Sequence, residues 1–276
     1  MKRLSIIAIP FLTIMLLGAQ FNGGESLAKA VSKKVDIKEK MLNSIDYYEY
    51  VEGVFTYDIG EKKYKAEFSV QEGSNPGSRT LVKDSSGQKV QELIADDDNN
   101  VLQLNTMAQT YVKMKSSKVE EIPKGDRVKK DKSPDGKEIN AYIYRQDPAN
   151  ALIAKTVTFP QEYAFWLDDE SQNYEILGEE KLLERNSVVI SGDLSEYLAK
   201  KLNSTSFKMW VDEETGVLLK LITLNKDNKI ENSIEVLEIN FDTKLAKTAQ
   251  KNFDTDDTKG YKQIKFDTKK PEKTKK

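Results

Sequence analysis

The stretch of residues 206–241 constrains the fold more than any other part of this sequence. Runs rich in β-branched and aromatic residues alternate there with turns that contain Asp, Asn and Gly, which accept positive φ angles or bond their own backbone. We predict three consecutive antiparallel strands over 207–211, 217–224 and 229–241. Such a meander cannot bury both of its faces alone, so it must belong to a larger sheet.

Similar short apolar runs recur upstream at intervals of about ten residues, which is typical of an antiparallel meander and not of alternating strands and helices. Apolar spacing predicts an amphipathic helix within 37–50, and the residues around Pro160 favour two short helices within 149–168. A further helix is expected over 194–202. The remaining expected strands are 54–59, 64–70, 79–83, 88–94, 101–105, 110–114, 139–144, 174–183 and 187–192.

Residues 1–30 have the pattern of a secretory signal peptide. Lys2 and Arg3 precede an apolar run, and Ala28-Lys29-Ala30 offers a cleavage site. The alternative is an uncleaved membrane anchor, but the apolar run is shorter than the roughly 20 residues that a membrane-spanning helix needs. We therefore expect an exported protein that acts outside the cytoplasmic membrane or in the cell envelope.

The sequence contains neither cysteine nor histidine. Their absence excludes disulfides, thiol nucleophiles, histidine general bases and zinc sites of the Cys/His type. The net charge of −2 argues against a nucleic-acid partner, which requires a concentrated basic surface. We expect no cofactor and no enzymatic activity. A hydrolase that uses pairs of carboxylates such as Glu120-Glu121, Asp168-Asp169 or Glu179-Glu180 is a remote alternative.

Two segments are strongly charged. Residues 115–138 contain proline and glycine among many charges and are predicted to form an exposed flexible loop that could act as a lid. Residues 255–276 are rich in lysine and are predicted to be a disordered tail. The tail either makes weak contact with an anionic membrane or wall polymer or has no partner. The folded domain is then expected to span residues 31–254.

Two sequence patterns resemble a known superfamily. Trp210-Val211-Asp212 before the Thr215-Gly216 turn is one, and Gly53-Val54-Phe55-Thr56-Tyr57 after a short helix is the other. They are similar to the LolA-like lipoprotein carriers and to the N-terminal domain of the RseB and MucB anti-sigma regulators. The resemblance implies an α+β fold in which a strongly curved antiparallel sheet, a half-barrel of about ten strands, wraps over helices on its concave face. The chain departs from the regulators because little follows Phe253 for their second domain.

The resemblance implies two functions. The leading hypothesis is an envelope binding module for a hydrophobic ligand (an acyl chain, a lipid or a lipoprotein). The alternative is a regulator that binds the outer domain of a membrane-bound anti-sigma factor. Strand parity and helix composition nominate the residues that line the ligand space. They are Leu102, Leu104, Val112, Met114, Tyr163, Trp166, Phe207, Met209 and Val211. For each of them, ordinary core packing is the competing interpretation.

Trp210 falls on the polar phase of its strand, beside Lys208 and Asp212. We interpret it as a candidate partner contact, with cross-strand packing as the alternative. The acidic turn at 96–100 has the oxygen ligands that calcium prefers, but it lacks the spacing of an EF-hand loop. A solvated turn without metal is therefore expected.

Overall fold

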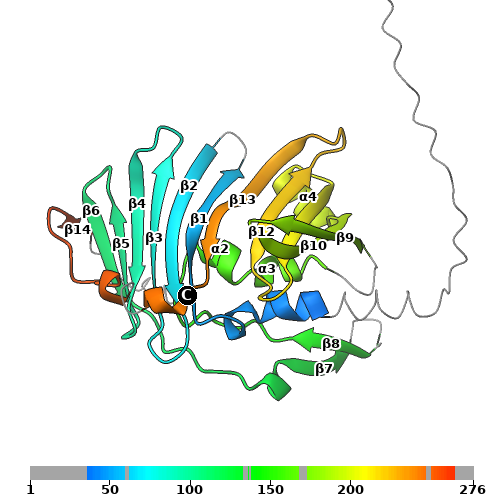
Figure 1. Cartoon of the computed structure of the whole chain (residues 1–276), viewed down its shortest axis with the longest axis horizontal. Helices are drawn as coiled ribbons and strands as arrows, with labels where there is room; N and C mark the ends of the chain where they lie inside the picture. Colours follow the sequence, from blue (N-terminus) through cyan, green and yellow to red (C-terminus); the bar gives the residue numbers. More distant parts are fainter. Residues whose placement is uncertain are drawn as a thin grey trace, which may run out of the picture.

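The computed structural model describes residues 36–59, 62–132, 136, 138–167, 173–246 and 250–264. The predicted signal peptide and the last twelve residues lie outside them. In the described part, a large curved sheet of twelve strands dominates, and helices lie on its concave face (Figure 1). The α+β half-barrel class is confirmed, with two strands more than the ten expected. Among these residues, none of the helices has the length and apolar content that crossing a membrane requires.

The sheet has the strand order β14-β6-β5-β4-β3-β2-β1-β13-β12-β11-β10-β9. Its strands are β1 Tyr50–Ile59, β2 Lys62–Gln71, β3 Gly77–Asp84, β4 Lys89–Ala95, β5 Asn100–Asn105, β6 Thr110–Lys115, β9 Tyr174–Leu182, β10 Arg185–Asp193, β11 Ser206–Asp212, β12 Leu218–Leu224, β13 Ile230–Asn240 and β14 Lys262–Gln263. All neighbours pair antiparallel except β14, which runs parallel to β6. The meander expected over 206–241 is present as β11, β12 and β13.

Two meanders, β1 to β6 and β9 to β13, meet where β1 pairs with β13. In this seam Phe55 lies opposite Val236, and a bulge at Val54 and Phe55 shifts the register. Both residues of the pair are buried, so the seam belongs to the core. The bulge adds local twist, which helps a wide sheet to curve.

The helices are short and lie before the first meander, between the two meanders along the chain or, in one case, within the second. Residues 36–42 form the first, which ends earlier than expected, and β1 already begins at Tyr50. Then follow α2 Lys155–Thr158, α3 Gln161–Ala164 and α4 Glu196–Leu202. Ser195 caps α4 by accepting a hydrogen bond from the Leu198 amide, and Asn203 ends it in the left-handed conformation.

The charged segment 115–138 is not a continuous loop. It contains the 3₁₀ turn η2 Lys124–Asp126 and the strand β7 Val128–Lys132, which pairs with β8 Glu138–Tyr142. This hairpin lies beside the N-terminal helix and apart from the main sheet (Figure 1). The prediction of a flexible loop is therefore wrong for the described strand residues of this segment, although β7 is exposed as expected.

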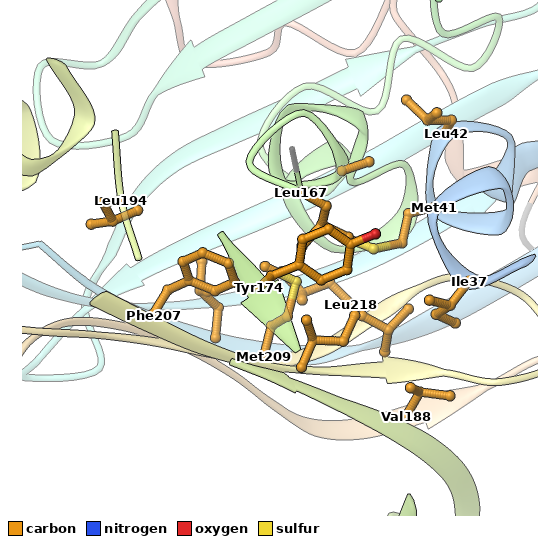
Figure 2. Packing of buried hydrophobic residues seen from close by; sticks show 14 residues of the cluster. Ile37, Met41, Leu42, Leu167, Tyr174, Val188, Leu194, Phe207, Met209 and Leu218 are labelled. Carbon is orange, nitrogen blue, oxygen red and sulfur yellow. The ribbon is translucent and has the colours of Figure 1, made fainter. Parts of the chain in front are cut away.

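The largest side chains of one core cluster come from the N-terminal helix, the segment after α3 and strands β9 to β12. Figure 2 shows the Tyr174 ring between Phe207 and Met41 of the helix, and Leu167 and Met209 belong to the same cluster. Phe207 and Met209 are completely buried. The cluster fixes the N-terminal helix and the helical segment against the same end of the sheet.

The C-terminal segment is ordered further than expected. Phe253 is buried beside Gly77, and the Thr255 hydroxyl donates a hydrogen bond to Asp96 at 2.6 Å. Lys113 forms an ion pair with Asp256. The prediction of disorder from residue 255 is thus wrong for residues 255–264, which are tied to the first meander through these contacts and through β14.

Candidate functional site

A cavity of about 850 Å³ lies between the sheet and the short helices. Strands β1, β12 and β13 form one wall, and residues of α2, α3 and α4 and of the segments beside them form the other. The wall is mainly apolar. Its residues are Phe55, Tyr57, Asp58, Ile153, Thr156, Glu162, Tyr163, Phe165, Trp166, Ser195, Tyr197, Leu198, Lys201, Leu202, Leu221, Thr223, Asn232, Ser233 and Ile234.

Tyr163 and Trp166 line this cavity, as the sequence predicted. Their rings meet edge to face with centroids 4.9 Å apart, and Trp166 in turn packs on Phe207 with centroids 5.6 Å apart. Burial raises the pKa of the Tyr163 hydroxyl, and the neighbouring Glu162 carboxylate raises it further. Tyr163 therefore remains a neutral phenol at physiological pH.

The helical wall is held in place by hydrogen bonds to distant segments. The Gln161 side chain accepts from the Arg145 amide at 3.0 Å and donates to the Arg145 carbonyl at 2.9 Å. Ser44 donates to the Thr158 carbonyl at 2.7 Å, which fixes the end of α2. Because both anchors are buried, the wall has a defined position relative to the N-terminal segment and to the loop before α2.

Polar groups at the α4 side of the cavity serve the same purpose. The Asn232 amide donates to the Leu202 carbonyl and to the Thr223 hydroxyl, both at 2.9 Å. Ser204 donates to the same hydroxyl at 2.8 Å. These bonds join the end of α4 to β12 and β13. The two charged side chains on the helical wall, Glu162 and Lys201, come from separate helical segments.

The other nominated residues do not reach the cavity. Phe207, Met209 and Val211 are fully buried in the adjoining core cluster, where Phe207 packs on the Trp166 ring. Leu102 and Leu104 belong to a different cluster, with Phe253 and Ala246. The prediction of one shared hollow for all nine residues is therefore wrong.

Val112 and Met114 lie on the opposite face of the sheet from Leu102 and Leu104, contrary to the prediction. Across β5 and β6, Leu104 lies opposite Tyr111 and Gln103 lies opposite Val112, and directly opposed residues share a face of a sheet. Val112 and Met114 thus point away from the side of Leu102 and Leu104. Met114 is 46% exposed and is not part of a hydrophobic cluster among the described residues.

Trp210 is not an exposed contact residue. It is only 9% exposed, and its indole donates a hydrogen bond to Glu180 Oε2 at 2.7 Å. The Nζ of Lys208 lies 4.6 Å from the centroid of its ring. The predicted partner contact is replaced by the cross-strand packing alternative, because neighbouring long side chains cover both the ring and its polar edge.

The acidic turn is organised by hydrogen bonds. Asp96 accepts bonds from the backbone of Asp98 and Asn100 and from the Thr255 hydroxyl. Burial opposes ionisation of Asp96, but these bonds, with those from the Asn100 side chain, lower its pKa overall. The carboxylate therefore closes the turn and ties down the C-terminal segment, and no metal-binding cluster is found among the described residues.

A second polar site lies outside the cavity. Asp46 pairs with Arg127 and, at 3.0 Å, with Arg145, and both guanidinium groups donate to Asn43 at 3.0 Å. The site joins the N-terminal segment, the start of the β7–β8 hairpin and the loop before α2. Segment 118–122 contributes to a hollow of about 460 Å³ here and does not line the large cavity, so the described part of 115–138 is not its lid.

Two more acids are buried beside this network. Burial raises the pKa of Glu72 far above its usual range, and the nearby Asp147 carboxylate raises it further. Burial also raises the pKa of Asp147, whose oxygens accept from the Ala149 and Ala151 amides at 3.0 and 2.8 Å. Burial and the repulsion between the two carboxylates thus favour the protonated form of Glu72.

The sequence analysis missed most of the sheet wall. Phe55, Tyr57 and Ile234 lie in segments correctly predicted as strands, but the pattern of each strand does not reveal the β1–β13 register that brings them together. The missed helical residues Leu198 and Leu202 follow an i, i+4 spacing that was visible in the sequence.

No family model matches the sequence, and no curated protein matches it. Solved structures do resemble the fold. An uncharacterized conserved protein of Thermus thermophilus aligns with 85% of this chain and 98% of its own, at 11% identity and a TM-score of 0.43. The lipoprotein LppX of Mycobacterium tuberculosis aligns with 77% of this chain and 99% of its own, at 10% identity and a TM-score of 0.37.

The structure of the MucA/MucB complex of Pseudomonas aeruginosa is also similar, with 16% identity and a TM-score of 0.43. The match covers 74% of this chain and 56% of that one, so the chain spans little more than half the length of the chain it matches. At 10–16% identity these likenesses concern the fold alone.

Proposed function

We propose that this protein is an exported, non-enzymatic binding module for a hydrophobic ligand, with an acyl chain of a lipid or lipoprotein held in the cavity. The observation that supports the proposal is the apolar cavity of about 850 Å³ between the sheet and the helices. Its volume lies within the range of roughly 300–1,000 Å³ that is usual for small-molecule sites. Export is inferred from the signal pattern at residues 1–30.

Burial of an acyl chain in the cavity supplies enough free energy for binding. Each buried methylene gains about 0.8 kcal/mol, so about fourteen of them gain roughly 11 kcal/mol. Association costs at least about 4 kcal/mol in lost freedom of motion, which leaves about 7 kcal/mol. This corresponds to a dissociation constant of the order of 10 μM. No charged anchor is needed for binding of this strength, and Glu162 and Lys201 are placed to contact a polar headgroup.

Binding of dodecanoate and hexadecanoate to the delipidated protein tests the proposal, with calorimetry and native mass spectrometry as readouts. Ile234→Trp places a larger ring in the cavity and should abolish binding, whereas Leu237→Trp on the same strand should not. Ile234 lines the cavity, while Leu237 is 40% exposed and lies outside it. If the unmodified protein binds no acyl chain, or if both variants bind equally well, the proposal fails.

The alternative, a regulator that binds the ectodomain of an anti-sigma factor, makes a different prediction. A membrane protein should then be retained by the immobilised chain after all lipid has been stripped, and Ile234→Trp should not affect its retention. Loss of the protein together with the lipid would favour the ligand-binding proposal.

A further inference from the structure

Four large apolar side chains are exposed around the helical side of the cavity. Tyr144 is 48% exposed, Leu152 41%, Phe165 43% and Tyr197 73%. Single exposed apolar residues are common on soluble proteins, but a cluster of them marks an interaction surface. These four residues are referred to below as the aromatic rim.

Two of the four residues are in contact, and three of them line the cavity or the hollow beside it. The rings of Tyr144 and Phe165 stack with their centroids 6.3 Å apart. Phe165 and Tyr197 both line the cavity. Leu152 lines a small adjoining hollow that shares Glu162 and Tyr163 with the cavity. The rim therefore borders the space in which the ligand is proposed to lie.

Lysines accompany the rim. Lys155 Nζ donates to the Tyr144 hydroxyl at 2.9 Å and lies 4.7 Å from the centroid of that ring. Lys200 and Lys201 occupy the last turn of α4, one turn after Tyr197. The acids on these helices are Glu162 and Glu196, so the three lysines leave a small positive excess.

This combination of side chains matches one kind of partner. Tyrosine and lysine carry a polar tip on an apolar body, and both are suited to the boundary between lipid tails and headgroups. A positive excess complements the negative surface of anionic lipids. A protein partner would not need amphipathic groups arranged at the edge of a lipid-sized cavity.

We propose that the aromatic rim docks on the surface of an anionic lipid bilayer, so that an acyl chain passes between the bilayer and the cavity. This inference rests on the proposed function and names the partner from which the ligand comes. Docking of this kind is peripheral and reversible, because a few side chains enter the headgroup layer. It should also weaken as the salt concentration rises.

Co-flotation of the full mature chain with vesicles of phosphatidylglycerol and phosphatidylcholine tests the proposal. The double variant Tyr144→Ser with Leu152→Asn removes two rim side chains that do not line the large cavity. Asparagine suits position 152 because Leu152 has a φ of 51°. Met107→Ser is the control, since Met107 is 63% exposed on the turn between β5 and β6.

The rim variant should bind vesicles at least about tenfold more weakly than the unmodified protein, while it binds dissolved dodecanoate with unchanged affinity. The control should behave as the unmodified protein, and Ile234→Trp should still bind vesicles. No vesicle binding by the unmodified protein would overturn the docking proposal, as would equal binding by the rim variant. Vesicle docking without any acyl-chain binding would instead overturn only the proposed function.

Discussion

Among the described glycines, Gly216 combines a left-handed φ with backbone atoms that an added methyl group would meet. It has a φ of +75°, and an added Cβ would overlap the Lys40 carbonyl and lie 2.7 Å from the Met41 amide nitrogen. The turn between β11 and β12 thus touches the backbone of the N-terminal helix. Neither backbone can yield without disturbing the cluster that contains Met41, Phe207 and Met209.

The expected cost of Gly216→Ala has two parts. A left-handed conformation costs an L-residue about 1–2 kcal/mol, and overpacking in a tight site adds about 1–3 kcal/mol. The sum of about 2–5 kcal/mol corresponds to a fall in Tm of roughly 4–20 °C for a domain of this size. The N-terminal helix should also become more sensitive to proteolysis.

Gly87→Ala provides the matched control. Gly87 has a φ of +82°, but a Cβ there would meet no atom within 4 Å, so only the conformational cost applies. Its Tm should fall by about 2–8 °C. Thermal unfolding of both variants, followed by circular dichroism, compares them directly. Equal losses in the two variants would refute the close approach of the turn to the helix.

Four further predictions concern the polar groups and the tryptophans. Because the pKa of Glu72 is raised in the folded protein, the folded state binds more protons than the unfolded chain, and the free energy of unfolding should fall as the pH rises above about 4.3. Glu72→Gln should flatten this dependence in urea unfolding measured from pH 4 to 8, and an unchanged slope would exclude Glu72 as its source. Arg145→Ala should lower the free energy of unfolding by about 3 kcal/mol, because a buried ion pair loses one partner; a loss below about 1 kcal/mol in the same assay would show that Arg127 alone suffices. Trp210→Phe should cost about 1.5–3 kcal/mol through the lost bond to the Glu180 carboxylate, with Tyr197→Phe, at an exposed position, as a neutral control. The same Trp210→Phe chain retains Trp166 as its one tryptophan, so its fluorescence should shift on addition of dodecanoate, and a constant spectrum at saturating ligand would place the ligand elsewhere.

Much of the fold could be predicted because its signals are local. The turns of the last meander contain Asp, Asn and Gly at the required positions, and β11, β12 and β13 differ from the expected strands by one residue at most ends. The division of this region into two short helices around Pro160 was also predicted correctly. By contrast, the described hairpin strands β7 and β8 follow Arg127, which binds Asn43 and Asp46 about eighty positions earlier. A charged, proline-containing segment gives no local sign of such a contact.

The cavity was predicted only in part, because it too depends on contacts between segments that are distant in the sequence. Side-chain alternation identifies two faces of a strand but not which faces of distant strands meet. Tyr163 and Trp166 were found because large aromatic groups on a short helix need a surface to pack against. Val112 was misplaced because the relation between β5 and β6 depends on the register across their turn, which alternation within each strand does not specify. Leu102 was misplaced because the strand order puts β5 four strands away from β1, beside a different core cluster.

The seam between β1 and β13 has a consequence for how the molecule assembles. Each meander contains mainly hairpin contacts between neighbouring segments, which form rapidly, whereas the seam joins residues nearly two hundred positions apart, such as Phe55 and Val236. The sheet therefore cannot become continuous until almost the whole chain is available. Until then the edges of β1 and β13 both remain unpaired, and a nascent chain should depend on chaperones or on delayed folding to avoid joining the wrong edge.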